Sequence, residues 1–165
     1  MIKKTIQDAI NRQLNRELYS AYLYLSMASY FDSVNQPGFS HWMKIQAQEE
    51  VAHGMRFYDY LIQQKNRVLM SDIETPQLEW VSPIAAFEHV LSHEKAVTSL
   101  INNLVKLATD EKDDVTYEFL KWFVKEQVEE EMSAGHALKK VKEAGTDKNK
   151  ISIVDSSLGK RVFKP

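Results

Sequence analysis

The chain has 165 residues, of which 44% are hydrophobic, and this is enough apolar material to bury a substantial core in one domain. Its formal net charge of −2 argues against a nucleic-acid partner, and the absence of cysteine excludes disulfides and thiolate metal sites. No apolar run approaches the length of a membrane span, and the N-terminus lacks a signal-peptide core. We therefore expect a cytoplasmic protein with no membrane partner.

Four long segments carry apolar residues at alternating spacings of three and four, which is typical of helices that bury one face. We expect helices over about residues 4–31, 39–64, 83–109 and 113–143. The turn between the first two is short, so these helices should be antiparallel neighbours. Ser82 and Asp113 are suited to cap helix N-termini, and Gly145 is placed to end the last helix.

Residues 66–82 have no sustained helical period. An extended chain of this length could span ~56 Å, whereas the second helix should be roughly 40 Å long. The connection can therefore run the whole length of a bundle and leave the third helix parallel to the second. Its apolar patches at 68–70 and 78–81 predict packing, either as a surface loop or as a crossover that also makes a subunit contact.

The segment 151–159 is too short to be a stable helix alone. Its apolar side chains, Ile151, Ile153, Val154 and Leu158, need a surface to pack on. The segment is therefore predicted to be an assembly element. The basic tail 160–165 is expected to fray.

Each of the four helical stripes carries polar residues at mid-length where the remaining positions are apolar. These residues, called the polar layer below, are Glu17, Glu50, His53, Glu94, Gln127 and Glu130. A buried charge costs several kcal/mol unless it is paired or bound to a metal, so one such layer shared by four helices predicts a metal site in a bundle core. The alternative is a purely structural layer that fixes the register of the helices.

The spacing of these residues repeats. Glu17 and Glu50 are 33 residues apart, and so are Glu94 and Gln127. This repeat predicts two helix hairpins related by a pseudo-twofold axis. Each hairpin would give one glutamate from its first helix and a pair spaced by three residues from its second.

Carboxylates combined with an imidazole favour Fe(II), Mn(II) or Zn(II) over Mg²⁺ or Ca²⁺. Several carboxylates in one layer predict two cations, with Glu50 as the bridge between them. Beside the layer lie Glu49, Glu126 and Glu129, called the outer acidic cluster below. This cluster predicts a third cation site, and the alternative is a solvated acidic face. Tyr24 is interpreted either as a core aromatic hydrogen-bonded to a ligand or as a redox-active phenol.

Residues 17–24, 48–53 and 122–131, together with Glu94, closely resemble the ferritins, and most closely the bacterial and archaeal non-haem ferritins. The resemblance covers essentially the whole chain. It implies an all-α fold: one ferritin-like domain over residues 1–165, with a four-helix bundle at about 4–144, a long crossover between the second and third helices, and a short fifth helix at about 147–158.

The resemblance also implies roles for individual residues. Glu17, Glu50 and His53 would hold the first iron, and Glu50, Glu94 and Glu130 the second, with Gln127 nearby. Glu49, Glu126 and Glu129, with Glu130 shared, match the family's third iron site, and Tyr24 matches the tyrosine beside the centre. Family members oxidise Fe(II) with O2 or H2O2 and store ferric mineral inside a homo-oligomeric cage of 24 subunits. The fifth helix would lie at the fourfold axis.

The sequence departs from related patterns at three places. The second pair is Gln127-x-x-Glu130 rather than Glu-x-x-His, which disfavours bacterioferritin and rubrerythrin and suits a site that passes iron on. Ala52 stands where bacterioferritins carry the haem-ligand Met, so no haem is expected. Lys121 replaces a second pore-lining acid of many animal ferritins, so iron entry through that pore is in doubt. The competing interpretation is a non-storage di-iron peroxidase or oxidase.

Overall fold

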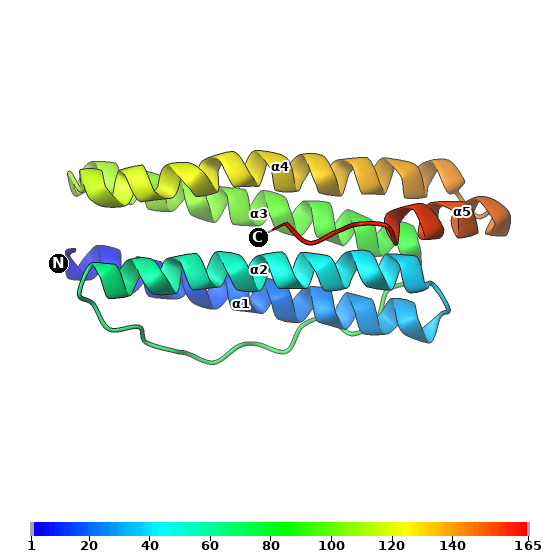
Figure 1. Cartoon of the computed structure of the whole chain (residues 1–165), viewed down its shortest axis with the longest axis horizontal. Helices are drawn as coiled ribbons and strands as arrows, with labels where there is room; N and C mark the ends of the chain where they lie inside the picture. Colours follow the sequence, from blue (N-terminus) through cyan, green and yellow to red (C-terminus); the bar gives the residue numbers. More distant parts are fainter. Residues whose placement is uncertain (1, 165) are drawn as a thin grey trace.

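The structure, a computed structural model, describes residues 2–164 and contains five helices and no strand within them (Figure 1). The helices are α1 (Lys4–Ser33), α2 (Pro37–Gln63), α3 (Pro83–Asp110), α4 (Asp114–Ala144) and the short α5 (Lys148–Leu158). The predicted all-α bundle with a fifth helix is therefore confirmed. The predicted caps are present as well, because Ser82 accepts the N–H of Ala85 at 3.1 Å and Asp113 accepts that of Thr116 at 2.9 Å.

The order of the helices follows from the lengths of their connections. The short turn makes α1 and α2 antiparallel, and α3 and α4 form a second antiparallel pair. The connection between α2 and α3 runs along the whole bundle, so that α2 and α3 are parallel as predicted (Figure 1). This crossover is fixed by the buried Trp80, whereas Leu69, Met70 and Leu78 are exposed in the single chain.

The buried stripes of the four long helices are those that the sequence pattern predicts. Their apolar residues form two clusters, one on each side of the polar layer. One cluster includes Phe31, Phe39 and Phe87, whose rings lie 5.3–5.8 Å apart between centroids. The other includes Phe57 and Phe123, which stack at 4.0 Å. The polar layer is therefore enclosed between two apolar cores.

The fifth helix packs on the ends of α2 and α4. Its Leu158 is buried and Ile151 and Val154 are half-buried, whereas Ile153 stays 69% exposed. The carboxylate of Asp155 accepts the backbone N–H groups of Gly38 and Phe39, at 3.1 and 2.8 Å. Asp155 thus satisfies free donors at the start of α2, and this fixes the orientation of α5.

The prediction that the tail frays is wrong at Arg161, which is held against α2. Residues 160–164 are called the C-terminal tail below, and Pro165 lies outside the described residues. The tail runs back from α5 towards the middle of the bundle (Figure 1). The guanidinium of Arg161 lies 4.3 Å from the ring centroid of Trp42, and its backbone oxygen accepts from His41 Nε2 at 2.9 Å. The fraying argument treats the tail in isolation, and it fails because the anchored α5 directs the tail onto α2.

Within residues 2–164, none of the helices combines the length and the apolar composition that crossing a lipid bilayer requires.

Candidate metal centre

All six residues of the polar layer are buried, and four helices contribute them: Glu17 from α1, Glu50 and His53 from α2, Glu94 from α3, Gln127 and Glu130 from α4. Their donor atoms form two compact groups in which every pair lies within 4.8 Å. The first group is Glu17, Glu50 and His53, and the second is Glu50, Glu94 and Glu130. Glu50 belongs to both groups, which is the geometry that a bridging carboxylate between two cations requires.

Amide side chains satisfy part of the layer. Gln13 Nε2 donates to Glu17 Oε1 at 2.7 Å, and Gln46 Nε2 donates to Glu130 Oε2 at 2.7 Å. Two acceptors remain without a partner although they are buried, namely Glu17 Oε2 and Gln46 Oε1. A buried acceptor without a donor is costly, and a cation coordinated by Glu17 Oε2 would remove that cost. The donor set therefore fits a metal ion.

The carboxyl groups of the layer have raised pKa values, and burial is the largest cause for each. The pKa values of Glu17 and Glu50 lie well above the ordinary value, that of Glu94 rises to about 7 and that of Glu130 to about 8. Repulsion from neighbouring carboxylates raises all four further. Without metal, the layer therefore keeps protons near neutral pH, and cations that bind there must displace them.

Tyr24 lies on α1 and donates a hydrogen bond to Glu94 Oε1. Burial, and then the charge of Glu94, raise the pKa of Tyr24 well above its ordinary value, so the phenol remains a neutral donor. The rings of Tyr24 and His93 are nearly perpendicular, with 5.8 Å between their centroids, and His93 Nε2 lies 2.8 Å from Ser20 Oγ. Burial lowers the pKa of His93 to about 4, so this imidazole is neutral too. Tyr24 is thus placed to orient Glu94.

Gln127 reaches the layer through its amide nitrogen. Gln127 Nε2 donates to the backbone oxygen of Glu94 and to Thr98 Oγ1, both at 3.2 Å. It also lies 3.4 Å from Glu94 Oε2. Gln127 therefore holds Glu94 in place, and a role as a direct ligand through its carbonyl oxygen stays a prediction.

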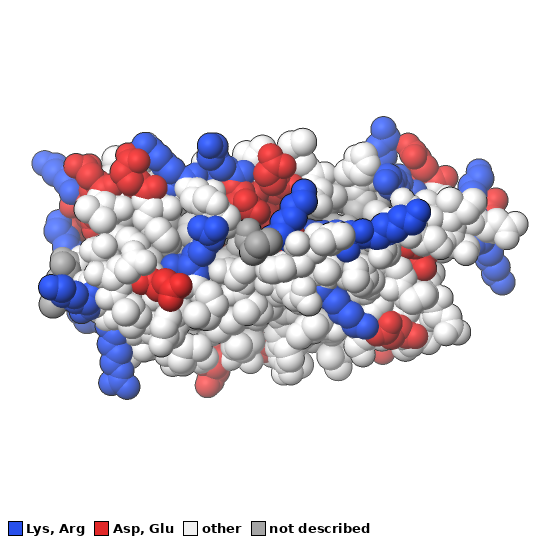
Figure 2. Space-filling view, viewed as in Figure 1, with Lys and Arg blue, Asp and Glu red and all other residues white. Residues whose placement is uncertain are grey.

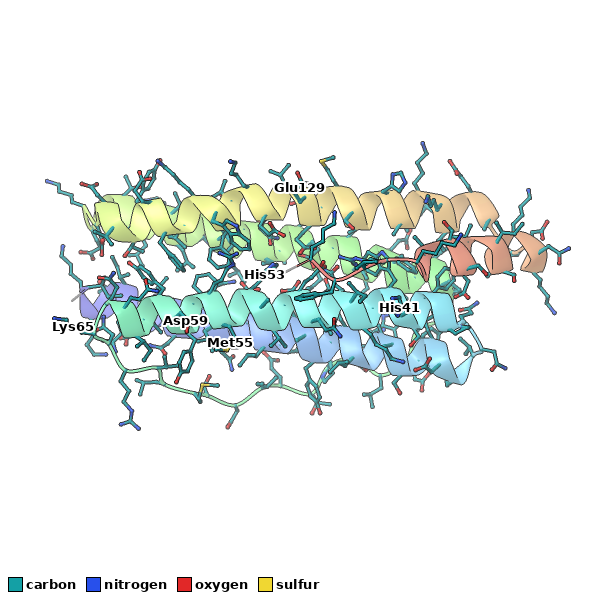
Figure 3. All side chains as sticks on the ribbon, viewed as in Figure 1. His41, His53, Met55, Asp59, Lys65 and Glu129 are labelled. Atoms are coloured by element: carbon teal, nitrogen blue, oxygen red, sulfur yellow. The ribbon has the colours of Figure 1, made fainter. Side chains whose placement is uncertain are left out.

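A cavity of about 770 Å³ lies beside the layer, lined by α2, α4, the end of α5 and the C-terminal tail. The outer acidic cluster, Glu49, Glu126 and Glu129, lines it together with His53, which is labelled with Glu129 in Figure 3. His53 Nε2 lies 3.8 Å from Glu126 Oε1 and 3.9 Å from Glu130 Oε1. These three residues make a further compact donor group.

The predicted combination of Glu49 with Glu126 and Glu129 is not brought together. No compact group found among residues 2–164 includes Glu49 or Glu129. Glu129 is exposed, and Glu49 forms an ion pair with Arg161 Nη2 instead. Burial raises the pKa of Glu49 by more than Arg161 lowers it, which fits a residue that is only 8% exposed.

Three residues of the site were not identified from the sequence as parts of it. Gln13 and Gln46 each stand four residues before a glutamate of the layer, and this spacing on one helix face was an available signal. Arg161 had no such signal, because 112 residues separate it from Glu49. Its position depends on how α5 docks.

The ferritin-like domain family matches residues 7–144 of this chain, which include the whole polar layer. The chain belongs to the ferritin family. A bacterial non-heme ferritin of Bacteroides fragilis is 43% identical over 161 residues, which cover 98% of this chain and 100% of the relative. A bacterial non-heme ferritin of Staphylococcus saprophyticus is 36% identical over 163 residues, which cover 99% of this chain and 98% of the relative.

Solved structures agree with this assignment. An Archaeoglobus fulgidus ferritin engineered into a closed form has a TM-score of 0.98 and 49% identity, and the match covers 99% of this ferritin and 100% of that chain. An open-pore ferritin of the same archaeon has a TM-score of 0.96 and 49% identity, and the match covers 98% of this ferritin and 100% of that chain. The fold of this ferritin is therefore shared over 98–99% of its length.

Proposed function

We propose that this ferritin is an iron-storage protein with ferroxidase activity. It oxidises Fe(II) with O2 or H2O2 at a di-iron centre inside one subunit and stores the ferric product as mineral. The observation that carries the proposal is the pair of compact donor groups that share Glu50. Relatives that are non-heme ferritins support the same activity.

In this proposal Glu17, Glu50 and His53 bind the first Fe(II), and Glu50, Glu94 and Glu130 bind the second. Two divalent cations balance the charge of the four carboxylates, and the protons that they displace leave the buried layer. The two ions give two electrons to O2, which takes up two protons and becomes H2O2. The neutral Tyr24 orients Glu94 during this step.

In this proposal the second iron leaves the centre for the mineral after oxidation. Its donor group of Glu50, Glu94 and Glu130 contains no imidazole, because Gln127 and Glu130 stand where related di-iron bundles have Glu-x-x-His. Gln127 is a neutral neighbour that adds little to the binding of a cation. A weakly held second Fe(III) can leave for the mineral, as a storage protein requires.

The outer acidic cluster is proposed to hold a third iron, with Glu130 shared between this site and the second one. The cavity beside His53, Glu126 and Glu130 supports this assignment because it gives an ion a place next to the layer. Glu49 and Glu129 would have to turn towards that ion. The alternative remains a solvated acidic face.

We also propose that the whole chain acts as one unit and assembles in the cytoplasm into a cage of 24 copies. Apolar side chains that stay exposed in the single chain support assembly, among them Ile153 of α5 and Leu78 of the crossover. The face in Figure 2 mixes acidic and basic groups and leaves a broad uncharged area over α2. Ferritins similar to this chain are described with open pores and in an engineered closed form, so pore closure is a further variable of the shell.

The test combines native mass with Fe(II) oxidation under air. A 24-subunit mass, rapid oxidation of two Fe(II) per subunit and retention of ferric iron are expected. A monomer or dimer that consumes peroxide without retaining iron would instead identify a non-storage di-iron peroxidase or oxidase. Protein that binds no metal would reduce the polar layer to a structural role.

A further inference from the structure

We propose that Arg161 is a tethered cation that occupies Glu49 in place of the third metal ion, so that the C-terminal tail controls access to the outer site. This inference rests on the proposed third site. It assigns a function to a residue outside the four-helix bundle and outside the stretch that the ferritin-like domain family matches.

The contacts of Arg161 place its charge on Glu49. Arg161 Nη2 pairs with Glu49 Oε2, and the two side chains are 16% and 10% exposed. The guanidinium also lies over the ring of Trp42, 4.3 Å from its centroid. Glu49 is thereby turned towards the tail.

The pairing is incomplete on the side of the arginine. Arg161 Nη1 is buried and has no hydrogen-bond acceptor. A buried donor without an acceptor is costly, so this arrangement is easier to open than a fully satisfied two-pronged pair. Arg161 is therefore held firmly enough to occupy Glu49 without the metal and loosely enough to leave.

The tail lines the cavity beside the polar layer. Lys160 and Lys164 of the tail line the same cavity as His53 of α2 and Glu126 of α4. A divalent ion on Glu49 would lie within a few ångströms of the guanidinium, in a place where water screens repulsion weakly. Glu49 can therefore form the ion pair with Arg161 or coordinate the metal ion, but not both at once.

Exclusive binding makes the coupling reciprocal. An ion in the outer site weakens the binding of the tail to Glu49 by a certain factor. The tail weakens the binding of the ion by the same factor, so loss of Arg161 must raise the affinity for the ion. Since a hydrogen bond to a charged group is stronger than one between neutral groups, we expect the affinity to rise by about tenfold. The inner sites, which do not use Glu49, should keep their affinity.

The experiment titrates Zn(II) anaerobically into the assembled metal-free protein and measures stoichiometry and affinity by calorimetry. Arg161→Ala is compared with Lys160→Ala, which removes the same charge from the same wall without touching Glu49. Arg161→Gln keeps part of the stem over Trp42 and replaces Arg161→Ala if that variant loses the shell. The affinity for the third equivalent of Zn(II) should be about tenfold higher in the Arg161 variant than in wild type. In Lys160→Ala it should stay within about threefold of the wild-type affinity.

A second readout follows the tail itself. In the wild-type protein, hydrogen exchange of residues 160–164 should speed up when the third equivalent binds, and not with the first two. Equal affinity in wild type and the Arg161 variants overturns the tethered-cation role and leaves the third site standing. An equal gain in Lys160→Ala overturns it as well, since it reduces the effect to total charge. If no variant binds a third equivalent of Zn(II), both the third metal site and the role of Arg161 are refuted. Binding of two equivalents would still support the di-iron centre.

Discussion

The polar layer and the outer acidic cluster use the same chemical groups but control their charge in different ways. In the layer, neutral amides and Tyr24 surround the carboxylates, and raised pKa values keep protons on them. In the outer cluster, a fixed arginine balances Glu49. A proton leaves when a metal ion arrives, but an arginine keeps its charge and can only move away. Burial also raises the pKa of Glu49, so both sites should respond to pH, but only the outer site should respond to the C-terminal tail as well.

The largest effect should come from removing the bridge. In Glu50→Ala, both compact donor groups lose a member, so the initial rate of Fe(II) oxidation should fall by about 100-fold, by analogy with the loss of metal-site residues. The variant should fold, and without metal its stability should equal or exceed that of wild type because a crowded carboxylate is gone. Stopped-flow oxidation and thermal unfolding measure both effects. Oxidation at the wild-type initial rate would refute Glu50 as the bridge.

The proton-based control of the layer can be tested through stability. Between about pH 4.5 and pH 8, the folded metal-free protein binds more protons at Glu94 and Glu130 than the unfolded chain. The free energy of unfolding should therefore fall as pH rises through this window, by an amount on the order of a few kcal/mol. Urea unfolding of the metal-free protein across this range measures it.

Glu130→Gln is the matched variant for this test, since its side chain is almost isosteric but carries no titrating proton. It should show a shallower fall across the same window. A stability that is constant or rising in wild type would mean that the layer does not hold these protons.

The arginine-based control depends on α5, because this helix directs the tail. Truncation after Lys150 removes most of α5 and the tail, and α1 to α4 should still fold and oxidise Fe(II). The retained mineral should drop several-fold, since the buried apolar side chains of α5 no longer support the shell. Native mass and iron retained after loading are the measurements.

Truncation after Gly159 is the control, because it keeps α5 and its Asp155 contacts and removes only the tail. It should retain mineral like wild type. Unchanged mass and full iron retention in the protein truncated after Lys150 would show that α5 neither closes nor supports the shell.

The smallest effect concerns the second iron. Gln127→Glu places a carboxylate where a neutral amide now lies beside Glu94. The second iron should stay longer, and turnover after the first two irons per subunit should slow by about threefold, as expected for a modest gain in charge attraction. Multi-turnover oxidation and residual iron after chelation measure it. Wild-type kinetics together with wild-type retention would remove Gln127 from the account of iron transit.

The sequence by itself determined the bundle and the polar layer. Helical periodicity places Glu17, Glu50, His53 and Glu94 on buried faces, and a four-helix bundle that buries these stripes brings them into one layer. Local rules also located the helix ends at Ser82 and Asp113 within a residue or two. These features depend on neighbours along one helix, which a sequence shows directly.

Only the tertiary structure decided which groups from distant parts of the chain control the charge. The contact of Gln46 with Glu130 crosses 84 residues, and that of Arg161 with Glu49 crosses 112. Asp155 anchors α5 to the start of α2, and only this docking turns an expected frayed tail into the wall of a cavity. Such pairings have no period along the chain, because they arise from the way in which separate helices meet in space.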